Sequence, residues 1–213
     1  MHKLIMLSQI YQQASIDNPD YLRLDPGNDL LWKFNRQRLD AEAIRDSMLL
    51  ISGYLDLRPG AAHPFPSEHN WDFTQHSQFT ALYETTRRSV YLMQQRIKKH
   101  PFLATFDGAD ANSSTAERMP STTPLQALFM MNDPFVHAQA AQFSTRLCEN
   151  GCDTDRIQRA YLMIFGRPAR TEEVQSAIDY VHRHRQNTSG KEDEAWTSLI
   201  RGLFASNEFL YID

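Results

Sequence analysis

The chain has 213 residues, of which 41% are hydrophobic and 23% are charged, and its formal net charge at pH 7 is −4. This composition is typical of a folded protein rather than a disordered one, and the small negative charge provides no basic footprint for binding nucleic acid. No apolar stretch approaches the length that crosses a membrane, so no membrane span is expected. We expect one large domain or two small ones.

The N-terminal segment is predicted to be mainly helical. An apolar run from Leu4 to Tyr11 indicates a first helix, and residues 17–28 form a loop because they contain two prolines and a glycine. Asp40 is placed to begin a clearer helix, and Gly53 is placed to end it in the left-handed conformation. The apolar positions of this helix recur at helical spacing and comprise Ala41, Ile44, Met48 and Ile51.

The middle of the chain is predicted to be irregular and rich in loops. Residues 89–93 fit either a short strand or a helical turn, and the polar run at 107–114 is a loop. His63, His69 and His76 lie in one segment that is rich in aromatic rings. Histidine is a common metal ligand, but these spacings match no usual zinc pattern, so we expect no bound metal there.

The C-terminal part has a strong helical pattern. Thr123, Pro124 and Gln126 form the signature of a capped helix start. Three amphipathic helices with short connections follow, which predicts a three-helix bundle. Its expected core comprises Ile157, Tyr161, Ile164, Val174, Ile178, Val181, Trp196, Leu199, Leu203 and Phe204.

The predicted fold class is therefore mostly α, with an irregular middle that holds at most a short hairpin. We divide the chain into residues 1–120, with the N-terminal helices and the loops, and residues 121–213, with the helical bundle. A single continuous domain is the alternative.

Cys148 and Cys152 are the only cysteines, and three residues separate them. They form neither a haem-attachment motif nor a set of zinc ligands. Two thiols are the favoured interpretation and a disulfide is the alternative, so the redox compartment stays open. The sequence also contains no phosphate-binding loop, nucleophile elbow or zinc-protease motif, and we expect no cofactor.

A first set of charged residues surrounds the start of the helix that follows Asp40. We call it the N-terminal charged group, and it comprises Arg36, Arg38, Glu42, Arg45 and Asp46. Helical spacing predicts the ion pairs Arg38–Glu42 and Glu42–Arg45. The simplest interpretation is a salt-bridged face that is either solvated or set between domains.

A second set lies in the irregular middle. This loop charged group comprises Arg87, Arg88, Asp107, Asp110 and Arg118. Arginine binds carboxylates and phosphates through paired hydrogen bonds, and two carboxylates can perform acid–base chemistry, so the group suits an anionic or sugar-like ligand. The interpretation that we favour is mutual ion pairing that holds the loops onto the helices. In that case only one of Arg87 and Arg88 should matter strongly for stability.

Several segments resemble one known family in order over nearly the whole chain. They are residues 2–6, 25–32, 35–46, 52–56, 86–91, 106–107, 121–128, 132–135, 165–168 and 206–213, together with Asp110. Each is weak alone, but jointly they resemble the planctomycete domain of unknown function 1553, also called the PSD1 domain.

This resemblance implies membership of a large secreted or periplasmic protein. Such proteins usually carry an upstream partner domain of unknown function 1549 and often a cytochrome c-like domain. This chain contains neither of these and no signal peptide, so we expect it to be a piece of a longer protein. The family supplies no established catalytic residues, and the matching positions with functional potential are Asn35 and the two charged groups.

Two functions are kept. The first is a non-catalytic scaffold or interaction domain that binds an upstream partner domain or a second copy, which predicts an exposed apolar surface near Leu4, Ile5 and Tyr11. The second is part of an enzyme or ligand-binding site for polysaccharide-like or anionic substrates, formed by the loop charged group. Convergence of that group on an open pocket favours the second function, and separate pairing beneath loops favours the first.

Overall fold

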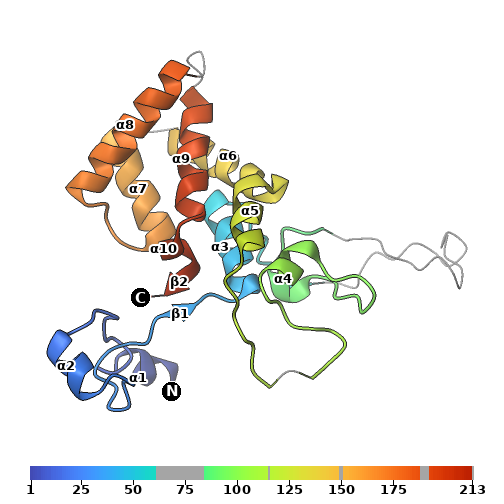
Figure 1. Ribbon diagram of the computed structural model, residues 1–213. Coiled ribbons are helices and arrows are strands. Elements are labelled where there is room, and N and C mark those ends of the chain that lie inside the picture. Colours follow the sequence, from blue (N-terminus) through green and yellow to red (C-terminus); the bar gives the residue numbers. More distant parts are fainter. Residues whose placement is uncertain (61–83, 115, 149–150, 188–191, 213) are drawn as a thin grey trace, which may run out of the picture. The chain divides into compact units, whose positions relative to one another are not determined.

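The computed structural model describes residues 1–60, 84–114, 116–148, 151–187 and 192–212 (Figure 1). The chain divides into two compact units. The smaller unit contains residues 1–39 and the C-terminal residues from Leu210 onward, and the larger unit contains residues 40–209. As predicted, the described part of the chain is mostly α-helical with an irregular middle.

The smaller unit contains two short helices and two short strands. These are α1 (His2–Met6), α2 (Pro19–Leu24), β1 (Gln37–Arg38) and β2 (Tyr211–Ile212). The strands pair antiparallel, with Gln37 opposite Ile212 and Arg38 opposite Tyr211. The pairing therefore joins the two ends of the unit, whereas the sequence had allowed at most a short hairpin in the irregular middle.

Local polar contacts decide where the first two helices begin and end. The helix predicted near Leu4 ends already at Met6, and the Ser8 hydroxyl donates a hydrogen bond to the Ile5 carbonyl at 2.7 Å. Such side-chain bonds compete with a continuing helical ladder. The loop expected at residues 17–28 is wrong in part, because α2 lies within it. α2 begins at Pro19, where the Asn18 side chain accepts a hydrogen bond from the Asp20 amide at 3.0 Å.

The loop between α2 and β1 is ordered by a buried amide rather than by an apolar core. Asn28 donates through Nδ2 to the Lys33 carbonyl at 2.8 Å and to Asn35 Oδ1 at 3.0 Å, and its Oδ1 accepts from the Lys33 amide. Its φ of 57° lies in the left-handed region, which asparagine tolerates better than most residues.

The larger unit is built from helices of very different lengths. In chain order they are α3 (Ala41–Ser52), a 3₁₀ turn (Ser89–Tyr91), α4 (Pro101–Thr105), α5 (Pro124–Asn132), α6 (Pro134–Cys148), α7 (Asp153–Phe165), α8 (Thr171–Asn187), α9 (Glu192–Phe204) and α10 (Asn207–Leu210). The segment that fitted a strand or a helical turn is thus the 3₁₀ turn. None of the helices in the described ranges is long and apolar enough to cross a membrane.

The predicted helix boundaries rest on caps that the structure contains. Thr123 Oγ1 accepts from the Gln126 amide, and the Gln126 side chain accepts from the Thr123 amide, which completes a capping box at the start of α5. Gly53 ends α3 with a φ of 86°. Arg146 Nη1 donates to the Ile51 carbonyl at 2.6 Å and so satisfies an orphan acceptor at the same helix end.

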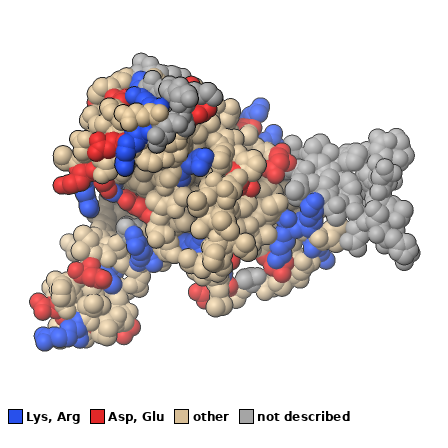
Figure 2. All heavy atoms as spheres, turned by 45° about the horizontal axis from the view of Figure 1, so that its top comes forward, with Lys and Arg blue, Asp and Glu red and all other residues tan. Residues whose placement is uncertain are grey.

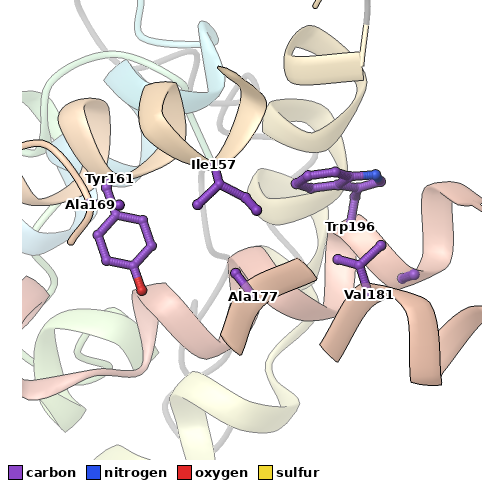
Figure 3. Packing of buried hydrophobic residues seen from close by; sticks show 7 residues of the cluster. Ile157, Tyr161, Ala169, Ala177, Val181 and Trp196 are labelled. Atoms are coloured by element: carbon purple, nitrogen blue, oxygen red, sulfur yellow. The ribbon is translucent and has the colours of Figure 1, made fainter. Parts of the chain in front are cut away.

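The C-terminal helices α7, α8 and α9 pack on one another as predicted, and α6 packs along α9 (Figure 1). Figure 3 shows Ile157 and Trp196 beside each other, with Ala177 and Val181 facing them. Six of the expected core residues are buried: Ile157, Tyr161, Ile164, Val181, Trp196 and Phe204. The other four, Val174, Ile178, Leu199 and Leu203, are only partly buried and pack against the edge of this core.

The compact larger unit runs across residue 120, where the sequence had suggested a boundary. α3 packs against α6, and the Ser52 hydroxyl donates to Gln139 Oε1 at 2.7 Å in the buried contact between them. Residues 40–209 therefore form one compact unit.

Candidate functional site

The two arginines of the loop charged group have separate partners. Arg87 Nε lies 3.5 Å from Asp56 Oδ2, and Arg88 Nε lies 3.9 Å from Asp46 Oδ2. Hydrogen bonds from Arg58 to Asp56 hold the pKa of this carboxyl well below its ordinary value, with a smaller contribution from Arg87. Neither arginine contacts a carboxylate of its own group in these pairs.

The two aspartates of the group also act apart. Asp107 accepts hydrogen bonds from the Ser121 amide at 2.7 Å and the Ser121 hydroxyl at 2.8 Å, and thereby ties two loop segments together. Asp110 accepts from the Asn112 amide and lies 3.3 Å from Lys99 Nζ. The Asn112 amide is the main cause that lowers the pKa of Asp110.

The fifth member, Arg118, pairs with a residue of the N-terminal charged group. Its Nη1 and Nη2 lie 2.6 and 3.0 Å from the two carboxylate oxygens of Glu42, a bidentate geometry. Burial raises the pKa of Glu42, but the hydrogen bonds and charge of Arg118 outweigh it, so the pKa lies below its ordinary value. Arg38 lies in β1, before the helix begins, so the helical spacing from which its pairing with Glu42 was predicted does not apply.

Arg45 is the buried charge of the N-terminal charged group. Its side chain is 2% exposed, and it does not use the predicted partner Glu42. Nη1 donates to the Arg87 carbonyl at 3.3 Å and to Ser89 Oγ at 3.2 Å, and Nη2 donates to the Thr85 carbonyl. Burial lowers the pKa of Arg45, and the charges of Glu84 and Asp46 oppose this effect. The sequence placed Arg45 in a salt-bridged face that was either solvated or set between domains, so its buried contacts with the segment 85–89 were missed.

The remaining members of that group fall in different places. Asp46 Oδ1 accepts from both the amide and the hydroxyl of Ser89 at 2.7 Å, so α3 holds the 3₁₀ turn through two adjacent residues. Arg36 belongs to the smaller unit, where its guanidinium lies 5.5 Å from the centre of the Tyr211 ring. The two charged groups therefore form intramolecular contacts at several sites rather than one site.

A cavity of about 730 Å³ lies in the larger unit beside Arg45. Its apolar wall contains Leu49 of α3 and the rings Phe102, Phe129 and Phe135, and its polar wall contains Arg45, Glu84, Thr85, Thr86, His100, Asp133 and Gln139. His100 Nε2 lies 3.2 Å from a carboxylate oxygen of Glu84. Neither His100 nor Glu84 was recognisable from the sequence as part of a site, since a histidine and a glutamate at this separation match no motif.

An exposed apolar segment lies in the smaller unit. Among residues 1–39, all of which are described, no apolar residue is buried. Leu4 is 80% exposed, and the apolar side chains that follow it up to residue 11 are exposed too: Ile5, Met6, Leu7, Ile10 and Tyr11. We call residues 4–11 the N-terminal apolar segment. The exposed apolar surface that was expected near Leu4, Ile5 and Tyr11 is therefore present.

The described residues contain no group of three or more His, Cys, Asp or Glu side chains that could hold a metal ion. His63, His69 and His76 lie outside the described residues. Cys148 and Cys152 are not joined to each other by a disulfide. On the face shown in Figure 2, basic and acidic side chains are interspersed rather than gathered in one basic area.

Fold and contacts define a mostly α-helical protein whose charged loop residues tie its segments together. A family model described as Protein of unknown function (DUF1553), PSD1, matches residues 1–181. The chain belongs to this PSD1 family, as the resemblance in its sequence predicted. No curated protein and no solved structure matches the chain.

Proposed function

We propose that this chain is a non-catalytic interaction domain that binds another protein through its N-terminal apolar segment. The supporting observation is the contrast between the two units. The larger unit buries an extensive apolar core, whereas residues 1–39 bury no apolar residue. An exposed set of large apolar side chains of this kind marks an interaction surface.

The number of side chains in the segment suits such a role. Fully burying a leucine or isoleucine yields about 1.5–3 kcal/mol. Association costs at least about 4 kcal/mol in lost translational and rotational freedom, so a single apolar contact is insufficient and several are needed. Residues 4–11 offer six large exposed apolar side chains, which is enough to exceed that cost.

The partner would be an upstream domain, as the family resemblance implies, or a second copy of this chain. For the purified chain in solution, we propose that a second copy covers the segment, because no other protein is then available to do so. Self-association would then be the property to measure on the purified chain.

The alternative function, a site for polysaccharide-like or anionic substrates made by the loop charged group, has less support. Arg87, Arg88, Asp107, Asp110 and Arg118 each have their own protein partner. These contacts are separate from one another, so the five side chains do not converge on one open pocket.

Sedimentation equilibrium of the full chain over a wide concentration range tests the proposal. We expect the mean mass to rise with concentration, and we expect Leu4→Asp combined with Leu7→Asp to remove the rise. Leu162→Asp is the matched control, because Leu162 is an exposed leucine on α7 of the larger unit. A wild-type chain that stays monomeric, or a control that dissociates as fully as the double variant, would contradict the proposal.

A further inference from the structure

We propose that the cavity beside Arg45 binds a small organic cation, an amine that carries an apolar or aromatic group. This proposal is independent of the N-terminal apolar segment. The cavity volume of about 730 Å³ falls in the range of small-molecule sites, which are about 300–1,000 Å³. Three phenylalanine rings and Leu49 on the wall would accept the apolar part of such a ligand.

The cavity wall includes polar groups that are buried and held in place. His100 is 6% exposed, begins α4 as its N-cap residue, and places Nε2 3.2 Å from Glu84. Its Nδ1 is buried and has no hydrogen-bond partner among the described residues. A buried polar atom without a partner is costly and uncommon in folded proteins. At a cavity wall it is best explained by a site that is completed by a ligand or by water.

The charge on the wall identifies the class of ligand. Arg45 is the one arginine that the described residues contribute to the wall. Its guanidinium already contacts two carbonyls, Ser89 Oγ and the Phe135 ring, whose centre lies 5.4 Å away. Asp46 also lies 4.0 Å from it. Arg45 therefore has little capacity left for an anionic ligand.

Two carboxylates remain on the wall. Asp133 uses Oδ1 to accept a hydrogen bond from the Phe135 amide, and Glu84 contacts His100. Among the described residues of the wall, these two carboxylates outnumber the single guanidinium. A cation gains from this charge and from neighbouring aromatic rings, whereas a carboxylate ligand would be repelled.

Calorimetric titration of the full chain with three probes of similar shape tests this inference. The probes are 2-phenylethylamine, the neutral 2-phenylethanol and the anionic 3-phenylpropionate. We expect the amine to bind most tightly. We expect Asp133→Asn to weaken its binding roughly ten-fold, because Asp133 is half-buried. We expect Glu84→Gln to weaken it about three-fold, because the Glu84 side chain is 65% exposed and its charge is screened by solvent. Asparagine at position 133 still caps α6, so the fold is kept.

Glu172→Gln is the matched control, because it removes an exposed carboxylate of α8 that is not part of the cavity wall. It should leave binding of the amine unchanged. Equal binding of the alcohol, tighter binding of the phenylpropionate, no binding of any probe, or amine binding that both cavity variants retain would each overturn the inference. Circular dichroism of each variant separates a lost site from a lost fold.

Discussion

Arg45→Ala is the substitution that best tests how the irregular middle is attached to the helices. The guanidinium of Arg45 is 2% exposed and donates hydrogen bonds to the Thr85 carbonyl, the Arg87 carbonyl and Ser89 Oγ. Removing it leaves these acceptors without their donor at a site that alanine cannot fill. The segment 85–89 should then lose its attachment to α3 at Arg45 while the contact through Asp46 remains.

The size of the effect follows from burial. Removing one partner from a buried charged contact costs about 3–5 kcal/mol, mostly through the groups that stay behind unpaired. Arg88 is the matched surface residue, since its side chain is 61% exposed and lies 3.9 Å from Asp46. A pair of that kind contributes about 0–1 kcal/mol. Arg45→Ala should therefore destabilise the fold several-fold more than Arg88→Ala does.

Thermal and urea unfolding of both variants, followed by circular dichroism, measures this difference. For a unit of this size a loss of 3–5 kcal/mol lowers Tm by roughly 6–20 °C. Arg87→Ala should also be mild, because Asp56 keeps Arg58 as a partner at 2.8 Å. That expectation replaces the earlier one that Arg87 or Arg88 is critical. An Arg45→Ala variant as stable as Arg88→Ala would refute the role assigned to Arg45.

Two glycines should respond to alanine with opposite signs in the same melts. Gly53→Ala should lower the free energy of unfolding by about 1–2 kcal/mol, because φ is 86° and a Cβ would lie 2.7 Å from the arginine that caps α3. In Gly202→Ala on α9 the new Cβ meets no atom within 4 Å, so the free energy of unfolding should rise by about 0.5–1 kcal/mol. Equal signs would show that local geometry does not control these positions. Unfolding measured as a function of pH should show how much Glu173 stabilises the fold, since hydrogen bonds from Arg167 lower its pKa from 4.5 to about 2. The ionised Glu173 carboxylate stabilises the fold fully above pH 4.5, and this stabilisation is lost as the pH falls toward 2. The stability difference between wild type and Glu173→Gln should therefore vanish over that pH range. The control Glu172→Gln should show no such change.

Local features of the chain were predictable from the sequence because they depend on residues a few positions apart. The capping box of Thr123 and Gln126 and the left-handed Gly53 are of this kind, and both are present. The apolar faces of α7, α8 and α9 likewise identified the C-terminal core, since helical spacing alone places residues on one side. The family was recognisable for a related reason, because its short motifs occur in order along the chain.

The partners of the charged residues were decided only by the tertiary structure. Glu42 and Arg118 are separated by 76 residues, and no spacing rule links them. Arg45 looked like a surface residue on a charged helix turn, yet the loop at 85–89 covers it and supplies its acceptors. The cavity beside it is likewise assembled from α3, α4, α5, α6 and the residues after 83. Helix formation is local, whereas burial and ion pairing depend on which distant segments the fold brings together, and that information is not contained in the spacing of residues along the chain.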